Sequence, residues 1–271
     1  MCIRQQPHIL FSPSHYTSSI LIKEFLLILL IAASLQGCTD TNTGVEQSKD
    51  TPIYKREREF TFLASHFSEQ GEKILLDTLV LTTSSKVFSK EYGQTRSSWA
   101  GTGENRQKSY SGIEESDTAV WIHPPRMGMY IKLELSPFPM VRYPLEAGSK
   151  WSWSLQVGNH YSVDGYAEWA DGTNEEFVSN YKIIGKVPLA TNLGVLTCYE
   201  VHSFTKSNFK QTELKAFYSE DFGFVKLEYL NIDQGRITME LINVKSVQAE
   251  LKNPAPELRQ QVSNYIQPKL K

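Results

Sequence analysis

The feature that most constrains this chain is a run of strand-like segments joined by short connections. Five such segments cover residues 181–187, 194–204, 211–219, 224–230 and 236–247. Their connections include Asp221-Phe222-Gly223 and Asp233-Gln234-Gly235, and these residue types favour tight turns. Because strands joined by tight turns pair in antiparallel order, the sequence predicts a C-terminal meander and not β–α–β units.

The clearest period of two lies just before this meander. The side chains expected on one face are Trp151, Trp153, Leu155 and Val157, and those on the other are Ser152, Ser154 and Gln156. Such a strand has one buried and one solvent-facing side. Further strand-like runs precede it at residues 59–67, 74–81 and 118–123.

These patterns predict an all-β fold with antiparallel sheets, built as a β-sandwich or as a strongly curved half-barrel. A short helix over residues 256–266 is the one helical element that the sequence suggests. The Gly- and Ser-rich stretch 92–117 is expected to be an irregular loop, and the alternation of residues 129–135 predicts another strand.

The N-terminal region carries an export signal. Lys23 precedes an apolar run over residues 25–35, which is too short for the roughly 20 residues that a membrane span needs. The run closes with Leu35-Gln36-Gly37-Cys38, in which one small residue directly precedes a cysteine. This layout is typical of a cleaved secretory signal peptide.

The Leu35–Cys38 segment resembles the lipobox of bacterial lipoproteins. The resemblance implies cleavage after Gly37 and a diacylglyceryl group on the Cys38 thiol, which would anchor the protein to a membrane of the cell envelope. In that family an aspartate directly after the cysteine marks retention in the inner membrane. Here Thr39 holds that place and Asp40 comes one residue later, so we expect the outer membrane. A plain cleaved signal, with Cys38 incidental, is the alternative.

The expected organisation is a signal peptide (1–37), a flexible tether (38–56), a β-rich domain (57–250) and a C-terminal tail or short helix (251–271). Removing residues 1–37 leaves 234 residues with 26 Lys and Arg against 29 Asp and Glu, a net charge of −3. No polybasic patch stands out, so we expect no nucleic-acid partner.

Only Cys198 remains besides Cys38 once residues 1–37 are removed, so stability must come from packing and not from disulfides.

The sequence offers little support for catalysis, metal binding or a cofactor. Cys198 and His202 lie four residues apart on an expected strand, about 13 Å at 3.3 Å per residue, which is too far for a nucleophile and its base. No spacing typical of metal ligands or of a phosphate-binding loop is present. The carboxylate pairs Glu114-Glu115 and Glu175-Glu176 fall in expected loops.

Four residues are the best candidates for ligand binding. His123 and Arg126 flank Pro124-Pro125, which would hold them stiffly at a strand end. Tyr166 and Trp169 lie in a Gly-containing loop, where exposed aromatic rings can bind a sugar or an acyl chain. Packing in the core is the alternative for these rings, and it is the favoured interpretation for Trp151 and Trp153.

Two functions of different classes remain. The favoured one is a non-catalytic, lipid-anchored binding module for a hydrophobic ligand, a glycan or a protein partner. The other is an anchored hydrolase of envelope or exported polysaccharide, which would need two carboxyl groups about 5 to 10 Å apart in a cleft. The sequence leaves the ligand and the oligomeric state open.

Overall fold

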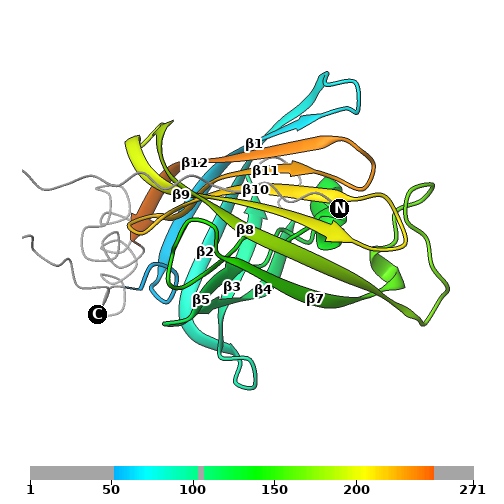
Figure 1. The fold of residues 1–271 in the computed structure, drawn as a ribbon, viewed down its shortest axis with the longest axis horizontal. Helices are drawn as coiled ribbons and strands as arrows, with labels where there is room; N and C mark the ends of the chain where they lie inside the picture. The colour runs from blue at the N-terminus through cyan, green and yellow to red at the C-terminus, as the bar shows by residue number, and fades with distance from the viewer. Residues whose placement is uncertain (1–51, 103–106, 247–271) are drawn as a thin grey trace, which may run out of the picture. The chain divides into compact units, whose positions relative to one another are not determined.

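The computed structural model describes residues 52–102 and 107–246 and shows twelve antiparallel strands in a single curved sheet (Figure 1). The strands are β1 (Arg58–Phe67), β2 (Lys73–Ser89), β3 (Gln94–Gly101), β4 (Lys108–Glu115), β5 (Ala119–Ile122), β6 (Met140–Arg142), β7 (Lys150–Gly158), β8 (Asn174–Thr191), β9 (Gly194–Lys206), β10 (Thr212–Ser219), β11 (Gly223–Leu230) and β12 (Arg236–Ser246). Two 3₁₀ helices, η1 (Gly128–Leu135) and η2 (Asn159–Tyr161), complete the elements. The predicted all-β half-barrel with its C-terminal meander is therefore confirmed, and the sandwich is not formed.

The sheet consists of two meanders joined at one pair of strands. Its order is β6-β5-β4-β3-β2-β1-β12-β11-β10-β9-β8-β7, so every neighbouring pair except β1–β12 is also consecutive in the chain. β1 and β12 pair over the whole length of β1, from Arg58 opposite Ser246 to Phe67 opposite Arg236. This one long-range pairing turns two local meanders into one half-barrel.

The pairing register shows which ends of the strands lie together. Arg58 and Ser246 lie side by side, so the described chain enters and leaves the sheet at one end, which we call the base. The opposite end, which we call the far end, carries the turns that follow β1, β9 and β11. The β7–β8 loop with η2 and the segment with η1 lie there as well (Figure 1).

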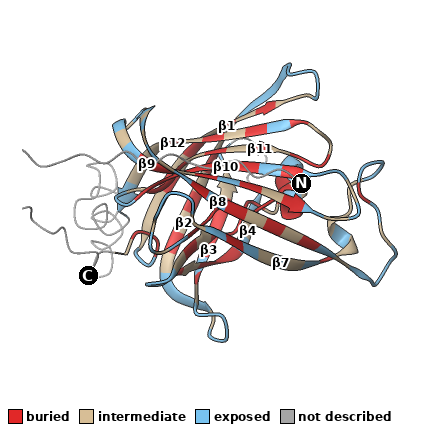
Figure 2. Ribbon diagram, in the orientation of Figure 1, coloured by how far each residue is buried: buried red, intermediate tan, exposed pale blue. Residues whose placement is uncertain are grey.

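Alternation along the strands produces the main core. Phe60, Phe62 and Ala64 of β1 are buried, and they lie beside inward residues of β2 and β12 (Figure 2). A second apolar cluster at the far end contains Leu135, Val157, Ala167, Phe177 and Ile232. None of the helices in the part of the chain that the structure describes is long and apolar enough to cross a membrane.

The expected loop over residues 92–117 is wrong for most of its length, because β3 and β4 lie there as interior strands. Their small polar side chains are buried but satisfied. Ser97 Oγ and Ser111 Oγ lie 3.0 Å apart, and Ser97 Oγ donates to the Ser111 carbonyl oxygen at 3.2 Å. Composition suggested a loop, whereas hydrogen bonding across the strands allows these residues to pair.

The expected strand over residues 129–135 is also wrong, because this segment forms η1. Tyr130 and Leu133 are buried, three residues apart, whereas Met129 and Ile131 are exposed. A 3₁₀ helix has three residues per turn, which explains this spacing. The prolines on both sides of the segment cannot donate to a strand ladder, so a strand is disfavoured there.

Just before β1, three successive backbone N–H groups bind one carboxylate at the base. Ile53 N–H donates to Glu115 Oε1 at 2.6 Å, and the N–H groups of Tyr54 and Lys55 donate to Oε2 at 2.9 and 2.8 Å. The Tyr54 ring is fully buried, and its hydroxyl oxygen accepts the Phe224 N–H at 2.7 Å. The last residues of the expected tether thus pack against the sheet. Its remainder, residues 1–37 and the C-terminal helix lie outside the described residues.

We predict that Glu115→Ala releases the segment before β1. Hydrogen bonds to a charged group contribute about 1.5 to 3 kcal/mol each, and they are not additive. We therefore expect a loss of about 3 kcal/mol of unfolding free energy, measured by urea denaturation, together with rapid tryptic cleavage at Lys55. Glu114→Ala is the control, because Glu114 accepts only from the Trp121 indole and a serine. Equal protease resistance in the two variants would contradict the prediction.

Candidate functional site

The strongest polar constellation at the far end is built on Glu134, which is only 3% exposed. Arg126 donates to it from two nitrogens, Nε to Oε2 at 3.1 Å and Nη2 to Oε1 at 2.7 Å. His123 Nε2 lies 3.4 Å from Oε2, an ion-pair distance. Two parallel hydrogen bonds between a guanidinium and a carboxylate fix the orientation of the two side chains as well as the distance between them.

Backbone contacts hold His123 and Arg126 in place. His123 follows β5, and its carbonyl oxygen accepts the Trp99 indole N–H at 2.7 Å. The Arg126 N–H donates to Ser109 Oγ at 3.2 Å. The prolines between His123 and Arg126 restrict the intervening backbone, so the two side chains converge on η1 from a stiff segment.

Both ring nitrogens of His123 face oxygen atoms. Nδ1 lies 2.9 Å from the Pro124 carbonyl oxygen, which can only accept, so Nδ1 carries the proton of this contact. Nε2 faces the Glu134 carboxylate. The one Glu134 carboxylate therefore lies against both His123 and Arg126.

The electrostatic environment favours the charged form of Glu134. Burial acts to raise its pKa, but hydrogen bonds and charges from His123 and Arg126 outweigh burial and lower the pKa below its usual value. The carboxylate is thus ionised, paired and shielded from water. A general acid needs a proton to give, so this state suits a positioning or binding role better than acid catalysis.

An aromatic cluster adjoins these charges. The Arg126 guanidinium lies 5.5 Å from the Tyr161 ring centroid, which is cation–π contact. Tyr161 and Trp169 both pack on the second apolar cluster. Trp169 lies 5.9 Å from Phe177 and 5.8 Å from Phe209, measured between ring centroids. Arg126 thus contacts Tyr161, and both Tyr161 and Trp169 pack on the same apolar cluster at the far end.

The far end also holds buried polar atoms that have no hydrogen-bond partner. Among the described residues these atoms belong to His66, His123, Ser136, Trp169, Tyr229 and Asn231. Burial and the charge of Lys132 lower the pKa of His66, so its ring is neutral, and burial raises the pKa of Tyr229. Polar groups of this kind are costly when buried alone, and their concentration at one end distinguishes it from the base.

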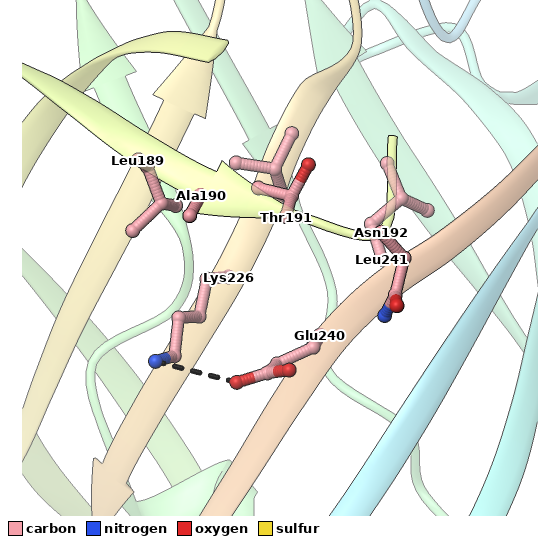
Figure 3. Close-up of a pocket in the computed structure, with 8 residues that line it drawn as sticks. Leu189, Ala190, Thr191, Asn192, Lys226, Glu240 and Leu241 are labelled. Carbon is pink, nitrogen blue, oxygen red and sulfur yellow. Dashed lines mark ion pairs between the residues drawn. The ribbon is translucent and has the colours of Figure 1, made fainter. Parts of the chain in front are cut away.

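A small pocket at the base is the other candidate. The tip of the β8–β9 hairpin lies across β11 and β12 there (Figure 3). The pocket has an empty volume of about 210 Å³, which includes open solvent, and its lining contains Leu189, Thr191 and the Lys226–Glu240 ion pair at 3.3 Å. Partial burial acts to lower the pKa of Lys226, but Glu228 and Glu240 raise it overall. Because both charges of this ion pair are matched, the pocket offers little to bind a charged ligand.

The structure brings three of the four candidate residues into one region. His123 and Arg126 meet at Glu134, and Trp169 joins them through the second apolar cluster. Tyr166 is 44% exposed in the same β7–β8 loop, with Lys210 Nζ 5.8 Å from its ring centroid. Sequence reasoning missed Glu134, since strand alternation only placed it on the face opposite the apolar residues Ile131, Leu133 and Leu135. Its one signal was the opposite charge of Arg126, eight residues earlier.

Cys198 and His202 do not form a pair. Cys198 is fully buried, and burial raises its pKa to about 11, so the thiol keeps its proton. His202 is exposed, with Nε2 2.6 Å from Glu200 Oε1. The expectation that Cys198 behaves as a small buried hydrophobic residue agrees with this environment.

Comparisons with known proteins give only distant likenesses. No protein-family model and no curated protein matches the sequence. Solved structures at 12% identity include a Bacteroides fragilis protein described as exported, with a YmcC-like fold (TM-score 0.44, covering 72% of this chain and 100% of that one). A Parabacteroides distasonis protein described as a lipoprotein gives 0.42 with the same coverage. The hypothetical lipoprotein YmcC from Escherichia coli gives 0.37, covering 84% and 98%.

All three TM-scores are below 0.5, and likenesses this distant define no function.

We predict that Glu134→Gln costs about 3 to 5 kcal/mol of unfolding free energy at pH 7, because it leaves Arg126 without its charge partner. The lowered pKa means that wild-type Glu134 stabilises the fold above its unfolded pKa, near 4.3, and loses this effect as the pH falls through the folded value. The difference between wild type and variant should therefore shrink in acid. Urea denaturation at several pH values measures it.

The control for this prediction is Glu228→Gln. Glu228 pairs with Lys226 and Lys215 on the half-exposed outer face, where an ion pair contributes about 1 kcal/mol or less. If Glu134→Gln and Glu228→Gln lose equal unfolding free energy, the buried Glu134–Arg126 pair does not stabilise the fold more than a surface pair does.

Proposed function

We propose that this protein is a non-catalytic binding module of the cell envelope, anchored by a diacylglyceryl group on Cys38 and recognising its ligand at the far end. One observation carries the proposal. The described chain enters and leaves the sheet at the base, whereas the charged and aromatic candidate site lies at the opposite end. An anchor that precedes the base would hold the base toward the bilayer and keep the far end accessible. With Thr39 after Cys38, we place the anchor in the outer membrane.

The chemistry of the far end supports a hydrophobic or glycan ligand. Aromatic rings give flat apolar surfaces, which suit sugar rings and acyl chains. The charged groups Glu134, Lys132 and Asp233 are paired, and the buried polar atoms that lack partners include those of the uncharged side chains Ser136, Trp169 and Asn231. A ligand with hydroxyl groups or an apolar body fits these features better than a strongly charged ligand does.

The carboxylates support binding over hydrolysis. Glu115 and Glu134 are the buried carboxylates among the described residues, and they lie at opposite ends of the sheet. Each is saturated with donors, Glu115 with backbone N–H groups and Glu134 with Arg126. A glycosidase needs two carboxyl groups about 5 to 10 Å apart, and these two do not meet that requirement.

The anchor is tested by metabolic labelling with a fatty-acid probe. We expect label on the native chain and on Cys198→Ala, and loss of label on Cys38→Ala, because Cys198 is buried in the core and Cys38 is the proposed acylation point. Detection is by gel fluorescence after purification. Equal label on the native chain and Cys38→Ala would show that the lipoprotein assignment is wrong.

Ligand binding at the far end is tested by native mass spectrometry of protein purified from its own envelope. We expect a co-purified lipid or glycan on wild type and a several-fold smaller bound fraction on Tyr166→Ala, because that variant removes the exposed aromatic ring of the β7–β8 loop. Val195→Ala is the control, since Val195 is 76% exposed at the start of β9, at the base. Equal loss in both variants, or no bound ligand on wild type, would contradict recognition at the far end.

A further inference from the structure

The β2–β3 hairpin extends past the base of the sheet. The ladder between β1 and β2 ends at Glu59 opposite Thr82, whereas β2 and β3 pair on as far as Ser89 opposite Gln94. Residues 84–94, which we call the β2–β3 tip, therefore project beyond the point where β1 begins. Most residues of the tip are exposed to solvent.

The β2–β3 tip carries three large apolar side chains. Val87 is 55% exposed, Phe88 is 44% exposed and Tyr92 is 62% exposed. Tyr92 lies in the turn itself, which is closed by the Gly93 N–H donating to the Lys90 carbonyl oxygen at 3.3 Å. Single exposed apolar residues are common on proteins, but three on one narrow hairpin indicate a surface that contacts something apolar.

Positive charge surrounds these apolar side chains. Two cations belong to the tip and two to the chain just before β1, and all four are exposed: Lys86, Lys90, Lys55 and Arg56. The Thr83 hydroxyl donates to the Arg56 carbonyl oxygen at 2.5 Å, which places Arg56 beside the start of the tip. None of the four cations forms an ion pair with another residue that the structure describes. Glu91 is the single acidic residue of the tip, so the local charge is positive.

This combination matches the surface of a bilayer. A tyrosine ring has an apolar body and a polar hydroxyl, which suits the boundary between acyl chains and headgroups. Lysine places its apolar stem along an apolar surface and keeps its charge in water, and each cation near an anionic bilayer strengthens binding. A stable protein complex buries about 800 Å² on each partner over some 20 to 30 residues, which is far more than one hairpin tip offers.

We propose that the β2–β3 tip docks on the surface of a bilayer that contains anionic phospholipid. Val87 and Tyr92 enter the headgroup boundary, and the cations contact lipid phosphates. This proposal deepens the proposed function and rests on it, because the anchor on Cys38 is what brings the base to the bilayer. Pro52 follows Cys38 by fourteen residues (52 minus 38), which span at most about 50 Å when fully extended. Docking of the tip would then fix which way the far end points.

The test is co-sedimentation with lipid vesicles. The protein is the chain from residue 38 onward with Cys38→Ala, which retains every residue that the structure describes and has no thiol to acylate at that position. One set of vesicles is phosphatidylcholine alone, and the other contains equal parts of phosphatidylcholine and phosphatidylglycerol. We expect binding to the mixed vesicles and about tenfold weaker binding or less to phosphatidylcholine, because the cations then lose their electrostatic attraction.

The apolar contribution is tested by a pair of double variants. Val87→Ser with Tyr92→Ser should bind the mixed vesicles several-fold more weakly, because the tip loses the side chains that enter the bilayer. The matched control is Ile74→Ser with Leu76→Ser. Ile74 and Leu76 are each 55% exposed near the start of β2, at the far end, so this control removes equally exposed apolar surface and should bind as the parent chain does.

The electrostatic contribution is tested in the same way. Lys86→Gln with Lys90→Gln should weaken binding to the mixed vesicles about tenfold or more, since each cation near an anionic surface contributes about a factor of five. Lys206→Gln with Lys210→Gln makes the same change at two exposed lysines of the far end and should leave binding unchanged. Urea denaturation of every variant verifies that the sheet is intact.

Three results would overturn the proposal. They are absence of binding to the mixed vesicles, equal binding to both kinds of vesicle, and equal losses in the tip variants and the far-end variants. Failure of the anchor has a different signature. It would appear as an unlabelled native chain in the fatty-acid experiment, whereas vesicle binding by the Cys38→Ala chain requires no acyl group.

Discussion

The pairing of β1 with β12 is the constraint on which the rest of the structure depends. Every other pairing in the sheet joins consecutive strands, which tight turns can specify locally. β1 and β12 are separated by most of the described chain, and their ladder makes the inward faces of both meanders one surface. The main core exists because of this ladder, since apolar residues of β1 lie between those of β2 and β12. Long-range pairing of this kind also makes folding slow.

The same ladder places both ends of the described chain at the base, so the base and the far end of the sheet differ. The chain enters and leaves beside one end, where Glu115 binds three backbone N–H groups and Tyr54 is inserted into the core. At the other end η1 is held by ionic and polar contacts, including Lys132 with Asp233 at 2.5 Å and the Tyr130 hydroxyl with Asp77 at 3.0 Å. At the base, residues 53–55 are bound to the sheet through Glu115. The far end holds the Glu134 ion pairs, the second apolar cluster and the buried polar atoms without partners.

The candidate site illustrates how far local reasoning extends. His123 and Arg126 were identified from a stiff strand end, and both contact Glu134 in the structure. Glu134 itself was missed, because η1 resembles a strand when only its alternation is considered. The composition of the Gly- and Ser-rich stretch likewise predicts a loop, because it does not show that Ser97 and Ser111 satisfy each other between interior strands. In both places a contact with a residue elsewhere in the sequence accompanies the outcome.

The sequence by itself determined the all-β class, the antiparallel meander after residue 181 and the inward side of β7, because turn chemistry and a period of two act between neighbours in the chain. It also carries the lipobox-like segment at Cys38, whose assignment as an anchor remains a prediction. Only the tertiary structure decided the half-barrel over the sandwich, the β1–β12 closure, the conformation of η1 and the contact of His123 and Arg126 with Glu134. Each of these depends on which distant surfaces meet, and hydrophobic burial rewards many such arrangements almost equally until the whole sheet is assembled.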